Sequence, residues 1–235
     1  HADLRTADLE GANLTEARLL GADLTGANLE NAVLKDAMLV DTDLRGAYLE
    51  NADLTGAVLV WATLIDAVLT YADLTGVDLQ YANLQAARLN YTNLSGANLE
   101  YASLVDATLK YVDLTDANLE GADLTSVDLS YAVLTGANLE GADLTDAVLT
   151  YADLTGETVL AFADLTDAYL KNANLTGAIL YKADLTDANL RDAVLTDAIL
   201  DYADLTDANL NYADLTDADL AHADLRTADL EGANL

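Results

Sequence analysis

Residues 2–14 read Ala-Asp-Leu-Arg-Thr-Ala-Asp-Leu-Glu-Gly-Ala-Asn-Leu, and the rest of the chain continues this pattern. Leucine occupies every fifth position from Leu4 to Leu154 and again from Leu160 to Leu235, which makes 47 five-residue units. Alanine stands two residues before nearly every leucine, and Asp or Asn most often lies between them. A period of five matches neither an α-helix nor a flat strand. It predicts a chain that turns a corner every five residues, with Leu and Ala inward and Gly, Asn or Asp at the corners.

The tandem motif Ala-Asp/Asn-Leu-x-x resembles the pentapeptide-repeat family over the whole chain. The resemblance implies an all-β fold, a right-handed quadrilateral β-solenoid with four pentapeptides in each square coil. Residue i then stacks on residue i+20, and adjacent coils rise by ~4.8 Å, the spacing of paired strands. We expect residues 1–235 to form one continuous solenoid of about twelve coils, roughly 55 Å long, with no capping helix. Its stability would be close to a sum over neighbouring coils.

The composition argues against several classes of function. There are 10 Lys and Arg against 41 Asp and Glu, a net charge of −31, which disfavours direct binding to nucleic acid. Cysteine is absent, and the two histidines occupy equivalent positions of a repeated segment, so no catalytic triad can be assembled. No apolar run approaches the ~20 residues of a membrane helix, so no membrane insertion is expected. We therefore expect neither an enzyme nor a resident cofactor.

The two ends of the sequence match. Residues 222–235 repeat residues 1–14 letter for letter, at an offset of 221 residues that equals eleven coils plus one extra residue. One interpretation is a period of a longer tandem array, whose coils continue into a fibre; both ends are ordinary pentapeptides without a cap. The other interpretation is an engineered repeat protein with duplicated flanks, or a trimmed natural domain.

Aromatic residues recur at intervals of 20. One predicted column contains Tyr71, Tyr91, Tyr111, Tyr131 and Tyr151, and the diagonally opposite column contains Trp61, Tyr81 and Tyr101, continued by Phe162 and Tyr202. Rings at strand spacing stack favourably. The columns are interpreted either as ladders that stiffen a corner or as adhesive strips for rod-to-rod contact or carbohydrate stacking.

An apolar set is predicted on the surface near the start of the chain. Its members are Leu20, Met38, Val40, Val58, Val60 and Trp61. Contiguous exposed apolar groups often mark an interface, whereas scattered β-branched residues simply favour strand surfaces. Both interpretations are open, and the set is the candidate interaction patch.

Aspartates also align. One column contains Asp3, Asp23, Asp43, Asp123, Asp143, Asp164, Asp184, Asp204 and Asp224, and a corner column contains Asp167, Asp187 and Asp207. Three interpretations are open: a solvated face that keeps the rod soluble, weak sites for divalent cations such as calcium, and imitation of duplex DNA. The last follows from the resemblance, since acidic members of the family bind the DNA-binding saddle of gyrase.

The phase of the repeat slips once. The stretch Thr155-Gly156-Glu157-Thr158-Val159-Leu160 has six residues where five belong. We expect a one-residue bulge at a corner between residues 156 and 159, with Glu157 or Thr158 pushed outward and Val159 in the place before Leu160. The bulge either leaves the solenoid undisturbed or forms a recognition feature on it.

The function that the sequence favours is a non-enzymatic structural rod, whose partner is the protein itself, stacked end to end or side by side. The alternatives are an acidic DNA mimic that binds and inhibits a type II topoisomerase, and a monomeric scaffold for other proteins. A fibre would be extracellular and a topoisomerase inhibitor cytoplasmic.

Overall fold

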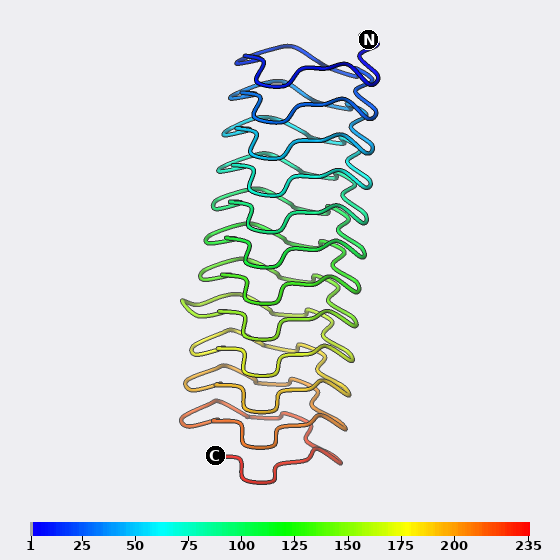
Figure 1. Ribbon diagram of the computed structural model, residues 1–235. Coiled ribbons are helices and arrows are strands. Elements are labelled where there is room, and N and C mark those ends of the chain that lie inside the picture. Colours follow the sequence, from blue (N-terminus) through cyan, green and yellow to red (C-terminus); the bar gives the residue numbers. More distant parts are fainter. Residues whose placement is uncertain (1) are drawn as a thin grey trace.

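The computed structural model describes residues 2–235, which form a rod of stacked coils with the two termini at opposite ends (Figure 1). Single-residue parallel β-bridges join each coil to the next, from Asp3 with Asp23 to Asp214 with Asn234. Bridged residues are 20 apart along most of the chain, so four pentapeptides complete one turn of the rod. Residues 2–235 contain no helix, and hence none that could cross a lipid bilayer.

Three of the five backbone N–H groups in a pentapeptide join neighbouring coils. In a representative unit, Leu24 and Gly26 donate to carbonyl oxygens of the next coil at 2.7 and 2.9 Å. Asp23 donates to a carbonyl of the preceding coil at 2.9 Å. The hydrogen-bond ladder therefore has a direction. Toward the carboxyl end, each pentapeptide donates two N–H groups and accepts one hydrogen bond.

The remaining two N–H groups close the corner. Ala27 donates to the carbonyl of Leu24 at 2.9 Å, which forms the turn. Thr25 donates to Oδ1 of Asp23 at 3.0 Å, so the Asp side chain satisfies the last donor of the unit. This accounts for Asp or Asn before the leucine, because both carry an acceptor at the right distance from the backbone.

The core is a continuous ladder of the motif leucines with alanine beside them. Leucines from Leu24 to Leu215 are 0–1% exposed. Burying each such side chain contributes on the order of 1.5–3 kcal/mol relative to leaving it in water. Because each coil contacts only its two neighbours, this stabilisation is distributed evenly along the rod.

Threonine replaces the inward alanine at Thr42, Thr92 and Thr158, and all three are buried. Each hydroxyl donates to a leucine carbonyl of the preceding coil; for Thr92 the acceptor is Leu69 at 2.9 Å. The hydroxyl therefore does not remain unpaired in the core, where an unpaired polar group would cost about 1–3 kcal/mol.

The six-residue unit is absorbed at a corner. Bridges that span it join residues 21 apart, and pairing returns to 20 once both partners lie beyond it. Glu157 is exposed with a φ of +63°, whereas Thr158 is fully buried and takes the inward alanine place. Of the two alternatives for the displaced residue, Glu157 is the one that lies outside; Thr158 stays inside, where its hydroxyl donates to the carbonyls of Leu134 and Thr155 at 2.8 and 2.7 Å. Val159 bridges in the place before Leu160, as expected.

Candidate interaction surfaces

The coil has four sides, which we name by their leucines. Side one contains Leu4 and its successors, side two Leu9, side three Leu14 and side four Leu19. On each side the residue before the leucine points outward, and two turn residues follow the leucine. The second turn residue has a positive φ at every corner of the regular coils, whether or not it is glycine.

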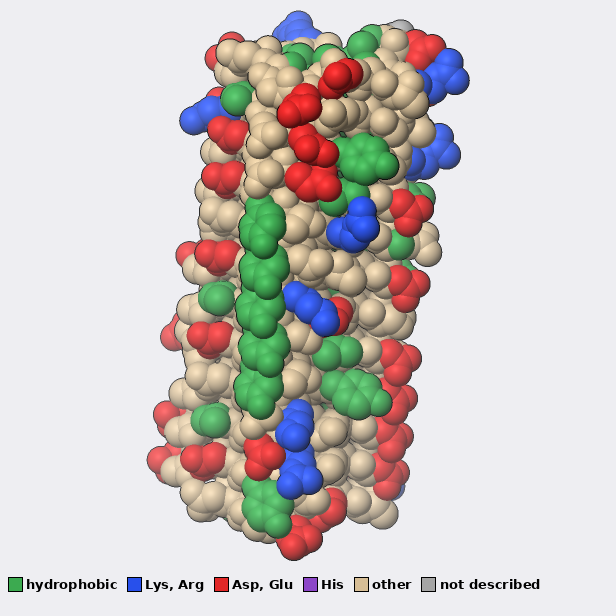
Figure 2. Space-filling view, viewed as in Figure 1, with side chains coloured by type: hydrophobic (Ala, Val, Ile, Leu, Met, Phe, Trp, Pro, Cys, Tyr) green, Lys and Arg blue, Asp and Glu red, His purple; other side chains and the backbone are tan. Residues whose placement is uncertain are grey.

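The first aromatic column is a stack of tyrosines on side two. Tyr71, Tyr91, Tyr111, Tyr131 and Tyr151 have successive ring centroids 4.8–5.1 Å apart and interplanar angles of 2–14°. The rings form a continuous stripe along the rod (Figure 2). All five adopt the left-handed backbone region, which costs a non-glycine residue roughly 1–2 kcal/mol. Stacking of ~0.5–1.5 kcal/mol per pair offsets part of that strain.

The second aromatic column, on side four, is interrupted. Trp61 and Tyr81 are tilted at 6.2 Å between centroids, and Tyr81 stacks on Tyr101 at 5.4 Å. Gly121 and Gly141 then occupy the next two corners. The ring of Tyr101 covers Gly121, where an added Cβ would lie 2.4 Å from the ring, whereas the space around Gly141 is open.

Phe162 and Tyr202, expected to continue this column, are separated by Lys182. Tyr181 makes edge-on contacts with both rings, and Lys182 Nζ lies 5.5, 5.1 and 5.9 Å from the ring centroids of Phe162, Tyr181 and Tyr202. Tyr202 also stacks on His222 at 4.4 Å, and Nδ1 of His222 is 3.0 Å from a carboxylate oxygen of Asp201. This part of side four is thus an aromatic cluster around a cation.

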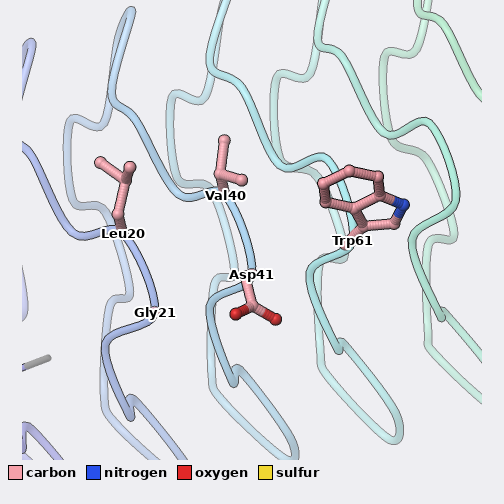
Figure 3. Close-up of a pocket in the computed structure, with 5 residues that line it drawn as sticks. All are labelled: Leu20, Gly21, Val40, Asp41 and Trp61. Carbon is pink, nitrogen blue, oxygen red and sulfur yellow. The ribbon is translucent and has the colours of Figure 1, made fainter.

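The candidate interaction patch surrounds an open groove on side four. The groove is lined by Leu20, Gly21, Val40, Asp41 and Trp61, and Leu20 and Trp61 are 50% and 59% exposed. Leu20 and Val40 point to the same side, and Asp41 points away from them (Figure 3). Val60 follows Val40 in the same column, while Met38 and Val58 are bridged to each other on the flat of the side. These six predicted residues form what we call the first apolar patch.

A second apolar patch lies on the same side and was not predicted from the sequence. Val159, Ile179 and Ile199 are bridged in succession, and the cluster of Phe162, Tyr181 and Tyr202 lies beside them. The one-residue slip hid them, because their numbers no longer differ from Met38 and Val58 by a multiple of 20. Counting from Leu160 after the slip would have found the alignment.

A polar stretch separates the two patches. Asn118 donates to Asn98 at 3.3 Å, and Asn138 donates to Asn118 at 3.1 Å, which makes an amide ladder on the flat of side four. The adjacent turn column holds Glu100, Glu120 and Glu140, with Gln80 donating to Glu100 at 2.7 Å.

The long acidic column lies on side one. Its nine predicted members share one line of bridges, which Thr63, Asn83 and Ser103 interrupt. The corner aspartates Asp167, Asp187 and Asp207 are exposed on the same side with φ of 57–60°. Figure 2 shows acidic side chains distributed over much of the visible face.

Arginines neutralise this column toward both ends. The side-chain hydrogen bond from Arg5 lowers the pKa of Asp3 to about 2, and Arg226 lowers the pKa of Asp224 in the same way. Arg45 donates Nε to Asp43 at 2.8 Å, and this bond lowers the pKa of the Asp43 carboxyl. Within residues 2–235 no group of three or more His, Asp or Glu side chains is placed to hold a metal ion.

A family model described as pentapeptide repeats (8 copies) matches residues 1–31, 42–80, 57–93, 78–116, 87–125, 102–141, 128–156, 158–197 and 198–235. The chain is a pentapeptide-repeat protein. Its solenoid is therefore a right-handed β-helix, and Glu157, the residue of the slip, falls between two matched stretches. Pentapeptide-repeat proteins are generally non-enzymatic scaffolds, and no enzyme family matches the chain.

Solved structures of pentapeptide-repeat proteins resemble this one. HetL, involved in heterocyst differentiation regulation in the cyanobacterium Nostoc sp., is 36% identical over 97% of this chain and 90% of its own, with a TM-score of 0.43. QnrB1, a plasmid-mediated fluoroquinolone resistance protein, is 17% identical over 95% of this chain and 86% of its own, with a TM-score of 0.49. A pentapeptide-repeat protein from the thylakoid lumen of Arabidopsis thaliana is 27% identical over 59% of this chain and 69% of its own, with a TM-score of 0.23. No curated protein sequence matches the chain.

Proposed function

We propose that this chain is a segment of a longer structural rod, in which units of 221 residues follow one another in one register. The identity of residues 1–14 and 222–235 carries the proposal. Asp224 lies in the column that starts at Asp3, and Asp229 in the column that starts at Asp8, so the copy occupies the same sides as the original. A slip of even one residue would have moved every inward leucine of the copy.

The junction between two such units is almost fully represented within this chain. Residues 222–235 rest on residues 202–215, and residues 2–14, which are identical to residues 223–235, are covered by residues 22–34. The only new contact at the junction places residues 15–20 of the following unit over residues 216–221 of this one. It brings Arg18 of the following unit over Asp219, and Leu20 over Ala221. The first pair has opposite charges and the second is apolar, so both favour continuation.

The same ladder supports stacking of separate chains end to end. Each coil gives two N–H groups and accepts one per unit toward the carboxyl end, so the carboxyl-terminal face of a coil complements the amino-terminal face of another. Head-to-tail contacts of this kind are heterologous and repeat without closing, which produces filaments.

A two-unit fusion tests the proposal. Residues 1–221 are followed by residues 1–235 in one polypeptide, and small-angle scattering or electron microscopy measures its length. We expect one straight rod that is longer than the single chain by ~53 Å, from eleven strand spacings. The matched control omits the histidine at the junction, which throws the second unit one residue out of phase and should introduce a bend. If the two-unit fusion is bent in the same way as the control, the proposal is contradicted.

A second candidate is imitation of duplex DNA, and the charge density favours it. A net charge of −31 over roughly 55 Å is about one negative charge per 1.8 Å, close to the ~1.7 Å of duplex DNA. The resemblance to acidic members of the family makes a type II topoisomerase such as gyrase the partner to test. Inhibition of gyrase supercoiling at micromolar protein supports this role, whereas filaments without inhibition support the rod. If neither inhibition nor filaments are observed, a monomeric scaffold for other proteins is favoured.

A further inference from the structure

Side four has eleven units, and its two apolar patches lie symmetrically about a point near the middle of these units. The leucines of these units are Leu19, Leu39, Leu59, Leu79, Leu99, Leu119, Leu139, Leu160, Leu180, Leu200 and Leu220. The first apolar patch covers the first three units, the second covers the eighth to tenth, and the amide ladder lies between them. A surface of this kind can face a reversed copy of itself.

We propose that two copies of this protein pair antiparallel through side four, about a two-fold axis that crosses the rod between its fifth and sixth units. Such an axis places each column opposite the same column of the partner copy and reverses the order of units. The first unit then faces the tenth, the second the ninth and the third the eighth. The proposal concerns lateral contact and holds whether or not the rod continues beyond this chain.

The second turn residues of side four form a column at its edge. Under this symmetry, large side chains in that column face small ones of the partner copy or stack on its rings. Tyr81 faces Gly141 of the partner copy, where the space above the glycine is open. Trp61 faces Phe162 of the partner copy, so two exposed rings cover each other. Tyr101 leans over Gly121 of its own chain toward the axis, where it meets the same ring of the other copy.

Charges on the same side are complementary as well. Asp41, on the second unit, faces Lys182 of the ninth unit of the partner copy. Arg18 of the first unit faces Ile199 of the tenth, and Leu20 faces Asp201, so this end of the interface adds no pair of opposite charges. The symmetry produces the pairing of Asp41 with Lys182 twice, which gives two pairs of opposite charges across one interface.

The flat of side four brings apolar residues together. Met38 faces Ile179 and Val58 faces Val159 of the partner copy, while Asn98 faces Asn118 and Asn138 faces Asp78. The adjacent turn column places Val40 against Tyr181. Eleven strand spacings by three strand residues give a contact of ~50 by ~10 Å, or ~1,000 Å² over both copies, the lower limit for a specific interface.

The centre of the interface carries a cost. Glu100 faces Glu120 of the partner copy, and this like-charge contact occurs twice. Together with the net charge of −31 on each rod, it makes pairing weak at low ionic strength. Salt at ~0.5 M screens charges beyond a few ångströms, so pairing strengthens as salt is added.

Sedimentation equilibrium with charge-swap variants tests the pairing. Asp41→Lys alone and Lys182→Asp alone should each weaken the dimer, roughly tenfold, and the two together should restore it. The matched controls are Asp106→Lys and Lys171→Asp, exposed residues on sides one and two, which should leave the dimer unchanged. Glu100→Gln with Glu120→Gln should strengthen the dimer about threefold to tenfold.

Cross-linking tests the direction of the two rods, because the natural chain has no cysteine. With a short bismaleimide, a mixture of Val58→Cys and Val159→Cys chains should cross-link, whereas either variant alone should not. Cross-linking of Val58→Cys with itself indicates parallel rods and overturns the proposal. A natural protein that stays monomeric at ~1 mM in ~0.5 M salt, or a double charge swap that does not restore pairing, also overturns it.

Discussion

The rings of Tyr111 and Tyr131 lie 4.8 Å apart with an interplanar angle of 6°, although both residues adopt a positive φ. Tyr111 also stacks on Tyr91 at 4.9 Å. Replacing Tyr111 by Asn, which tolerates this backbone region, removes two ring pairs without adding strain. We expect the free energy of unfolding to fall by ~1–3 kcal/mol, measured by denaturant titration. The control is Tyr212→Asn in the same column, between Asp192 and Gly232, which should cost less; an equal loss contradicts the stacking argument.

The leucine ladder makes a second prediction. Leu104 is fully buried, and Leu104→Ala leaves a cavity that the rigid coil cannot close. We expect a loss of ~2–5 kcal/mol in the free energy of unfolding. Val105→Ala, at the half-exposed position next to it, should cost far less. Similar losses at both positions contradict the inward assignment of leucine.

The carboxylates before the leucines are predicted to act mainly through hydrogen bonds. Asp123 Oδ1 accepts from the backbone N–H of Thr125 at 3.1 Å and from its hydroxyl at 2.7 Å. Asp123→Asn keeps an acceptor and removes one charge from the acidic column, so its unfolding free energy should be unchanged or higher. Asp123→Ala loses the acceptor and should cost ~1 kcal/mol by thermal unfolding. An asparagine variant as unstable as the alanine variant would show that the charge itself matters.

The ion pair of Asp43 and Arg45 predicts a pH dependence. Hydrogen bonding from Arg45 holds the pKa of Asp43 below its unfolded value. A lowered folded pKa stabilises the fold above the unfolded pKa of ~3.9, and the stabilisation is lost as pH falls through the folded pKa. Asp43→Asn should therefore be less stable than the natural protein at pH 7 and equal to it in strong acid.

Urea titrations at several pH values measure this difference. Asp143→Asn is the control, because Thr145 stands where Arg45 stands and the neighbouring Asp123 and Asp164 repel the carboxylate. It should be at least as stable as the natural protein at pH 7. A difference between Asp43→Asn and the natural protein that persists in strong acid would exclude the ion pair as its cause.

The extra residue at the slip is predicted to be dispensable. Deleting Glu157 leaves Gly156, whose φ is already +70°, at the second turn position and keeps Thr158 inward. We expect a folded rod with an equal or higher melting temperature by circular dichroism, because a shorter corner costs less entropy. Deleting Asp146 from a regular corner should destabilise the rod strongly. A rod that tolerates neither deletion would give Glu157 a structural role.

Much of the architecture could be read from the sequence, because a period of five fixes which side chains point inward. The stacked tyrosines from Tyr71 to Tyr151 and the line of bridges from Asp3 followed from this period together with the four pentapeptides per coil that the family resemblance implies. The role of Asp and Asn before the leucine did not, although a count of N–H groups per unit would have shown one donor without a backbone acceptor. The sequence left open whether Glu157 or Thr158 is displaced, because residue spacing does not show the hydrogen bond that the Thr158 hydroxyl makes inside the coil.

The side-four symmetry could not be read from the sequence for a different reason. It relates units far apart in the chain across the slip, and it depends on where Tyr181 and Lys182 lie relative to Phe162. Periodicity places residues in columns but says nothing about how rings and cations group within a column.

Each coil is bonded only to the coil before it and the coil after it. A tensile load applied to the two ends of the rod therefore falls on every coil boundary in series, and the terminal turns, bonded on one face, give way first. Each turn that peels away releases 20 residues, or ~66–72 Å of slack chain, while the remaining turns keep their shape. Under force the molecule is therefore expected to extend in steps of equal length, one coil at a time.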